Sequence, residues 1–236
     1  MFTYKGIRND EMHLRVLNDV VFESPTRDVN VIQVPGRDGD LIVDNGRFNT
    51  VIRSIPCRIE VPNGENVEET IHKISQWLVD DGNFHPFTWD NDPEFTYLAR
   101  VSGSVVSNRL LKTLGHTTID FQLHPVKYLK TSLNETQIIE SGRIHNPYGV
   151  TAKPLIRVIG DGNITIHIGG RPLVLQGIVL GCIIDTETQT ITSLSGQLTI
   201  FERMRSPFPV LTPGENQITG PRFVQIHVTP RLGALV

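Results

Sequence analysis

The chain of 236 residues is long enough for one large or two ordinary domains. Hydrophobic residues make up 39% of it and charged residues 20%, a balance typical of a soluble globular protein. The net charge of −3 and the pI near 6.2 leave no basic field for phosphate backbones or anionic membranes, so we expect no sequence-specific nucleic-acid binding and no membrane insertion. The N-terminus also lacks the basic-then-apolar pattern of a cleaved secretion signal.

Residues 31–48, VIQVPGRDGDLIVDNGRF, carry three turn signals between short apolar runs. The expected reversals are Pro35-Gly36, Asp38-Gly39 and Asn45-Gly46. The GRDGD loop lacks the lysine of a phosphate-binding loop, and no helical pattern follows it. We therefore expect Arg37 and Asp38 to lie exposed on the corner of a hairpin.

Several segments alternate apolar and polar residues with a period of two, the pattern of a half-buried strand. The inward positions expected from this pattern are Ile55, Cys57, Ile59 and Val61; Ile119, Phe121 and Leu123; Ile164, Ile166 and Ile168; and Val224, Ile226 and Val228. Cys57 and Cys182 stand far apart in strand-like runs, so we expect two buried core residues and no disulfide. Gly169-Gly170 predicts a two-residue hairpin turn.

Residues 66–82 form the one segment with a helical pattern. Its apolar positions fall on a single stripe: Val67, Ile71, Ile74, Trp77 and Leu78. Asn66 and Glu69 make a capping-box pattern at the start, and Gly82 is a natural stop. An amphipathic helix among strands is expected to pack on one face of a sheet.

Residues 132–154 are polar and rich in turns, which indicates a domain boundary. The chain before this stretch contains strands and the helix, whereas the chain after it contains only short strands, as in a β-sandwich. We therefore expect a mainly β fold with two domains, residues 1–135 and residues 136–236. It stays open whether the last strand returns to the first domain.

The polar clusters do not have the arrangement of a catalytic or metal site. Asp90, Asp92 and Glu94 are spaced like part of a calcium loop, but the loop glycine and the final glutamate are missing, so we prefer a solvated turn. Asp185 and Glu187 are expected at a hairpin tip, with no apolar surroundings to raise a pKa for acid–base work.

The other signatures of catalysis are also missing from the sequence. The eight histidines show no HxH or HxxxH spacing, and no GxSxG motif is present. GDGN at residues 160–163 precedes a strand rather than a helix, unlike a dinucleotide-binding loop. We therefore expect a protein that is not an enzyme and that has no cofactor and no metal.

Five stretches occur in order along nearly the whole chain. They are VPGRDG at residues 34–39, WLVDDGNFHPFTWDNDPEFTYLARV at residues 77–101, IHNPYGVTAKPLIRVIGDGNITIHIGG at residues 144–170, CIIDTETQTI at residues 182–191 and FPVLTPGENQI at residues 208–218. Together they resemble the distal tail protein (Dit) family of long-tailed bacteriophages, whose relatives also occur in prophages and phage-tail-like bacteriocins.

The resemblance implies a structural virion protein at the tail tip, assembled in the cytoplasm of the bacterial host. Residues 1–135 would be a tail-tube-like β-sandwich with one α-helix, and six copies would close into a ring around a channel for DNA. Residues 136–236 would be a galectin-like β-sandwich that docks receptor-binding or baseplate proteins. The tail tube protein and a tail-associated fibre or lysin protein would be further partners.

A β-rich subunit with an edge strand and a long hairpin can pair with its neighbour around a ring. Arg37 and Asp38 are therefore candidates for an intersubunit or tube-facing contact. The main alternative is a carbohydrate-binding module that contributes to host adsorption, because galectin-like sandwiches include glycan binders. The region after Pro154 has few aromatic rings on which a sugar could stack, since it holds phenylalanines but no Trp or Tyr. A hydrolase ranks third, for lack of a nucleophile, metal or carboxylate arrangement.

Overall fold

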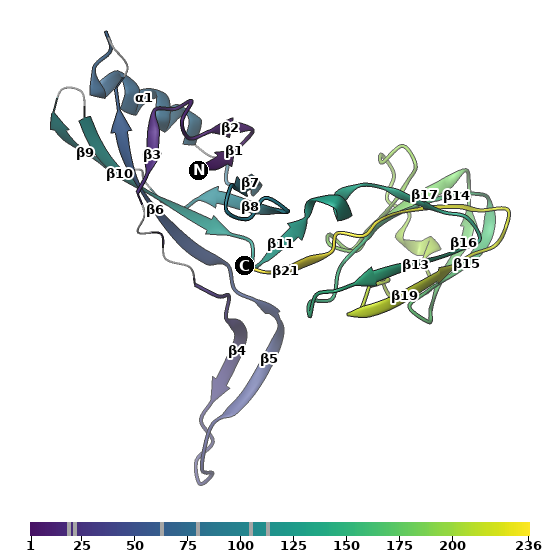
Figure 1. The fold of residues 1–236 in the computed structure, drawn as a ribbon. Helices are drawn as coiled ribbons and strands as arrows, with labels where there is room; N and C mark the ends of the chain where they lie inside the picture. The colour runs from purple at the N-terminus through teal and green to yellow at the C-terminus, as the bar shows by residue number, and fades with distance from the viewer. Residues whose placement is uncertain (18–19, 21–22, 62–63, 79–80, 104–105, 112–113) are drawn as a thin grey trace. The chain divides into compact units, whose positions relative to one another are not determined.

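The computed structural model describes residues 1–17, 20, 23–61, 64–78, 81–103, 106–111 and 114–236 (Figure 1). Contacts divide the chain into two compact units. Unit 1 comprises Met1–Lys127 and Leu235–Val236, and unit 2 comprises Tyr128–Ala234. Among the described residues, no helix is long and apolar enough to cross a membrane.

The largest sheet, which lies in unit 1 except for parts of β11 and β21, runs in the order β2-β1-β7-β8-β10-β6-β3, with β9 beside β10 and with β11 beside β8 and β21. Its strands are β1 (Phe2–Tyr4), β2 (Ile7–Arg8), β3 (Leu14–Val16), β6 (Val51–Glu60), β7 (His85–Trp89), β8 (Phe95–Val101), β9 (Val106–Leu111), β10 (Leu114–Leu123), β11 (Val126–Leu129) and β21 (Gly233–Leu235). The predicted alternation is confirmed in β6 and β10, where Ile55 pairs with Ile119 and both are fully buried.

Helix α1 (Val67–Leu78) packs on the aromatic core of this sheet. The Trp77 ring stacks on Phe2 with centroids 6.2 Å apart, and its Nε1 donates a hydrogen bond to the Tyr4 carbonyl at 3.2 Å. The predicted cap is present, because Glu69 N–H donates to Asn66 Oδ1 at 2.9 Å. The helix prediction is therefore confirmed as far as Leu78; residues 79–80, just before the expected stop at Gly82, lie outside the described residues.

Unit 2 is built from two antiparallel sheets with a shared apolar core. One sheet has the order β12-β20-β14-β17-β18 and the other the order β13-β19-β15-β16. The strands are β12 (Thr136–Ile138), β13 (Ser141–Asn146), β14 (Leu155–Ile159), β15 (Gly162–Ile168), β16 (Arg171–Ile178), β17 (Gly181–Asp185), β18 (Thr190–Ser193), β19 (Gly214–Thr219) and β20 (Gln225–Thr229). Two 3₁₀ turns, η1 (Lys130–Leu133) and η2 (Phe201–Arg203), complete the unit.

The core of unit 2 follows the predicted pattern. Ile164, Ile166 and Ile226 are at most 1% exposed, and Cys182 is fully buried. Gly169 and Gly170 join β15 to β16 with φ of 56° and 79°, as expected for a tight hairpin turn. The prediction of a mainly β fold with one α-helix is thus confirmed in the described residues.

The remaining strands, β4 (Arg27–Ile32) and β5 (Leu41–Phe48), form a separate two-stranded sheet in unit 1, drawn in Figure 1 as a long hairpin. The prediction of a reversal at Asn45-Gly46 is wrong. These residues lie inside β5, where the register shifts opposite Arg27 and Val29. Gly46 has a φ of 73°, which suits a bulge in a continuing strand as well as it suits a turn.

Candidate assembly surfaces

Residues 27–48, hereafter the arm, carry large apolar side chains that are open to solvent. Val31 and Ile42 pair across the hairpin and are 57% and 65% exposed. The same is true of the other large apolar residues of the arm: Val29, Ile32, Val34, Leu41 and Val43. A two-stranded hairpin with no packed face is marginally stable by itself. A surface of this kind is typical of an interaction site.

Side-chain bonds stiffen the arm where β5 bulges. The Asp28 carboxylate accepts hydrogen bonds from Arg47 Nε at 2.5 Å and from Asn45 Nδ2 at 3.2 Å. The hydrogen bond from Arg47 is the main reason why the pKa of Asp28 lies below its ordinary value. Across the same two strands, Arg27 Nη2 lies 3.0 Å from Asp44 Oδ2. The bulge is therefore cross-linked between the strands.

Arg37 and Asp38 lie in the loop between β4 and β5, as the turn chemistry predicts, and both are exposed. Gly36 and Gly39 have φ of 81° and 77°, so the loop needs its glycines. An open hollow of about 460 Å³ is lined by residues of the loop, including Arg37 and Asp40. Nothing else in the described chain covers the loop, and its contact with another subunit stays a prediction.

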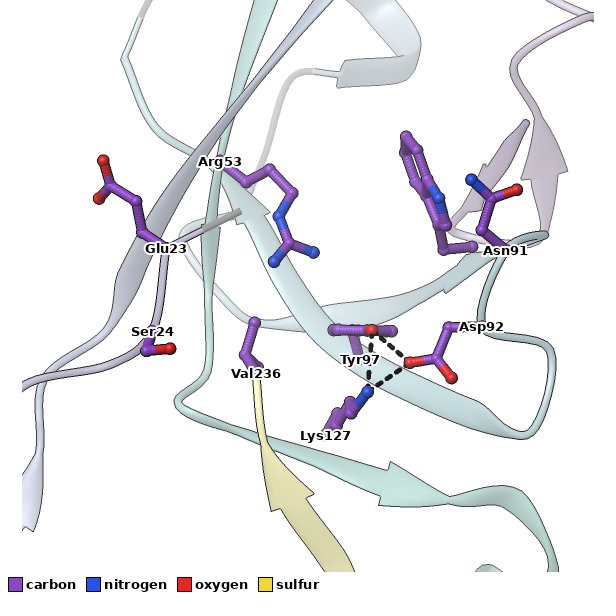
Figure 2. Close-up of a pocket in the computed structure, with 9 residues that line it drawn as sticks. Glu23, Ser24, Arg53, Asn91, Asp92, Tyr97, Lys127 and Val236 are labelled. Atoms are coloured by element: carbon purple, nitrogen blue, oxygen red, sulfur yellow. Dashed lines mark hydrogen bonds and ion pairs between the residues drawn. The ribbon is translucent and has the colours of Figure 1, made fainter. Parts of the chain in front are cut away.

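A second hollow, the Arg53 pocket, has a volume of about 280 Å³ and lies in unit 1 (Figure 2). It is lined by Glu23, Ser24, Arg53, Trp89, Asn91, Asp92, Tyr97, Lys127 and Val236. The Arg53 side chain is 2% exposed, and its guanidinium lies 5.8 Å from the centroid of the Tyr97 ring. Sequence reasoning missed Arg53, although it stands in the inward phase of β6, two residues before Ile55.

The carboxylate of Asp92 anchors the opposite wall of the Arg53 pocket. It accepts hydrogen bonds from Lys127 Nζ and from the Tyr97 hydroxyl, each at 2.5 Å (Figure 2). The expected turn is present at residues 90–94 and its other residues are exposed, but the Asp92 side chain is only partly exposed, because Tyr97 and Lys127 contact it. Among the described residues, no group of three or more His, Cys, Asp or Glu side chains could hold a metal ion.

Burial and charge shift the pKa values in this pocket in different directions. Burial lowers the pKa of Arg53 and raises that of Tyr97, because each loses solvation of its charged form. Burial alone would also raise the pKa of Asp92, but the bonds from Lys127 and Tyr97 outweigh it, and the pKa lies below its ordinary value. The pocket thus brings the cations Arg53 and Lys127 together with the Asp92 carboxylate, whose charge acts on Arg53 as well as on Lys127.

The other residues singled out in the sequence have structural surroundings. Asp185 accepts two hydrogen bonds from Arg231, at 2.6 and 3.1 Å, and Glu187 lies 3.2 Å from Lys153 Nζ. The two carboxylates at this hairpin are therefore ion-paired to different partners. Burial raises the pKa of the Cys57 thiol, as it does for Cys182, to about 12, so neither favours the reactive thiolate.

Comparison with solved structures finds the same fold in phage tails. The crystal structure of SPP1 Dit (gp 19.1), described as a paradigm of the hub adsorption apparatus in phages that infect Gram-positive hosts, matches with a TM-score of 0.73 and 16% identity over 96% of each chain. The phage P2 baseplate, activated with Ca, matches with a TM-score of 0.46 and 11% identity over 92% of this chain and 90% of that one. Only the first likeness is high enough to define the fold, and it confirms the predicted resemblance at that level.

No family model and no curated protein matches this sequence. The overall identity to SPP1 Dit is low. The likeness is therefore one of backbone architecture, which fold comparison detects and sequence comparison does not.

Proposed function

We propose that this chain is a structural virion protein of a phage tail tip, a distal tail protein whose six copies form a ring between the tail tube and the baseplate. The observation that carries the proposal is the likeness to SPP1 Dit over 96% of both chains, which extends through unit 1 and unit 2. The work of such a protein is assembly, and it needs no reaction.

The arm is the feature best suited to hold one copy to the next. Its exposed apolar side chains would be covered by a neighbouring subunit, at a gain of about 25 cal/mol for each Å² of apolar surface removed from water. A contact between an arm and a different surface of the neighbour is heterologous, and such contacts form a ring when the rotation between successive copies closes. Arg37 and Asp38, at the loop of the arm, would then make intersubunit contacts.

The two units would divide the remaining contacts. Unit 1 would form the ring and meet the tail tube protein and the tail-associated fibre or lysin protein, and unit 2 would dock receptor-binding or baseplate proteins. The net charge of −3 suits a channel wall that DNA slides past, since a basic wall would hold the phosphates. The proposed location is the tail tip of the virion, after assembly in the cytoplasm of the host.

The ring is tested by light scattering after size exclusion, followed by negative-stain images of the purified full chain. We expect annular particles with six-fold class averages and a mass near six times 26.4 kDa. A mass that stays at 26.4 kDa over a hundredfold range of concentration, with and without the tail tube protein, would contradict the proposal.

A matched pair of surface variants separates the arm from other exposed apolar residues. Ile42→Asp in the arm and Val179→Asp in unit 2 change side chains that are 65% and 69% exposed. We expect Ile42→Asp to abolish the annular particles, because a charge would be buried in the contact, and Val179→Asp to leave them intact. Equal particle yields from both variants would count against the arm.

A further inference from the structure

Both faces of the arm carry exposed apolar side chains. Residues that pair across two strands lie on the same face, whereas successive residues along a strand lie on opposite faces. Val31 pairs with Ile42, and the next pair along the strands is Ile32 with Leu41, so the two pairs lie on opposite faces. All four side chains are exposed, by 38% to 65%. The arm therefore lacks a covering layer on each of its two faces.

The same alternation assigns the other side chains of the strands to the two faces. Face A comprises Arg27, Val29, Val31, Ile42 and Asp44, and face B comprises Asp28, Asn30, Ile32, Leu41 and Val43. The ion pair between Arg27 and Asp44 lies within face A, in agreement with this assignment. Asp28 accepts hydrogen bonds from Asn45 and Arg47, which places these two side chains on face B.

The two faces have the same arrangement along the arm. On each face the charged side chains lie near the bulge, and the large apolar side chains lie between them and the loop. Two arms that point in the same direction can therefore stack, with face A of one on face B of the other, so that apolar residues meet apolar residues. Sheets that pack in this way lie about 10 Å apart and bury the side chains between them.

The charges near the bulge are opposite on the two faces of each strand. Strand β4 carries Arg27 on face A and Asp28 on face B, whereas β5 carries Asp44 on face A and Arg47 on face B. Arms that are related by rotation and point in the same direction stack β4 on β4 and β5 on β5, so each cation meets an anion. The Arg27 and Arg47 side chains are 49% and 74% exposed, which leaves N–H groups for a second carboxylate.

We propose that face A of each arm packs on face B of the arm of a second copy of this chain. The inference rests on the proposed ring and names the surfaces that would join its subunits. A contact of face A with another face A joins two copies and leaves both B faces uncovered. Packing of face A on face B covers every arm on both sides through one repeated heterologous contact, and such a contact forms a ring when the rotation closes.

Two adjacent residues provide matched variants, because Leu41 lies on face B and Ile42 on face A. Both positions are exposed, so we expect Leu41→Asp and Ile42→Asp to leave the circular dichroism spectrum unchanged. Each variant alone should lose the annular particles and stay near the monomer mass of 26.4 kDa in light scattering. An equimolar mixture should give a dimer of twice that mass, since the intact face A of the Leu41→Asp chain packs on the intact face B of the Ile42→Asp chain.

A mixture that stays monomeric at ten times the concentration at which the unchanged chain assembles would overturn the inference. Annular particles from either variant alone would overturn it too, because each variant has one face that cannot pack.

Cross-linking identifies the facing surfaces without removing the contact. Leu41→Cys and Ile42→Cys chains are treated with a short bismaleimide, singly and as an equimolar mixture. The native cysteines, Cys57 and Cys182, are buried and are expected not to react. We expect at least tenfold more covalent dimer from the mixture than from either chain alone. Equal yields from Ile42→Cys alone and from the mixture would show that face A meets face A, which would reject the inference.

The same experiments separate this inference from the proposed ring. Annular particles from the unchanged chain, without excess cross-linking in the mixture, would reject the stacking of the arms and leave the ring in place. Mixed dimers and selective cross-linking by a chain whose unchanged form gives no annular particles would reject the ring and leave the contact between the arms.

Discussion

The arm and the sandwich of unit 2 contain the same kinds of apolar residue, but these residues are exposed in the arm and buried in the sandwich. Both place isoleucine and valine along antiparallel strands. Ile164 and Ile166 on β15 are fully buried, whereas Val31 and Ile42 in the arm are 57% and 65% exposed. The strand β15 belongs to a sheet faced by a second sheet, and the arm has only two strands. Strand formation therefore follows local residue type, while burial requires a facing layer.

The largest difference is expected from the same truncation at the two places. Ile166→Ala should lower the free energy of unfolding by about 2–5 kcal/mol, because it leaves a cavity in a closed core. Ile42→Ala should change it by no more than about 0.5 kcal/mol, since the side chain is already in water. Urea unfolding followed by circular dichroism measures both, and equal losses would remove the contrast between the regions.

A pair of glycines sharpens the comparison. An added Cβ at Gly181 in unit 2 would clash with the carbonyl oxygen of Val158, whereas one at Gly46 in the arm meets nothing within 4 Å. Both have positive φ, which costs a non-glycine residue about 1–2 kcal/mol. Gly181→Ala should lower the free energy of unfolding by a further amount of about 1–3 kcal/mol, because the added methyl group overpacks the core. Thermal unfolding of the two variants measures the loss of stability in each. A Gly46→Ala chain as unstable as Gly181→Ala would contradict an arm with open space around Gly46.

Acid should affect the ion pair of unit 2. The pKa of Asp185 lies below its ordinary value because the bonds from Arg231 outweigh the effect of burial, which alone would raise it. A carboxylate with a lowered folded pKa stabilises the protein above its unfolded pKa, and this contribution is lost as the pH falls through the folded pKa. In the Asp185→Asn variant, the free energy of unfolding should therefore fall less between about pH 5 and pH 2 than in the unchanged chain. An unchanged pH profile in urea titrations would show that the pair does not contribute.

The smallest effect is expected from charge reversal in the loop of the arm. Arg37→Glu should leave folding unchanged, because the side chain is exposed, but weaken association between copies. A charge of this kind at the rim of an interface contributes roughly 0.2–1 kcal/mol to association. We therefore expect the affinity between copies to fall by up to about fivefold, and this loss should be smaller at high salt. Sedimentation velocity at two salt concentrations measures the association. If the variant assembles like the unchanged chain at both salt concentrations, Arg37 has no role in the contact.

Local chemistry was sufficient to predict the helix and several of the strands. The cap at Asn66, the turn at Gly169-Gly170 and the alternation through Ile55 and Ile119 all depend on neighbours in sequence or on a simple period. The Asn45-Gly46 signal failed because the same positive φ serves a bulge as well as a turn. The ion pair of Asp92 was not predicted because its partner Lys127 stands 35 positions later in the chain.

Residue order alone thus indicated the helix and several strands, since backbone preference and hydrophobic period act over a few neighbours. It could not show that the apolar residues of the arm stay exposed, or that Arg53 occupies an inward position beside Tyr97. Both depend on which layer or side chain comes to face a strand from elsewhere in the chain. That pairing is a long-range choice, made by the packing of whole sheets, and only the folded structure contains it.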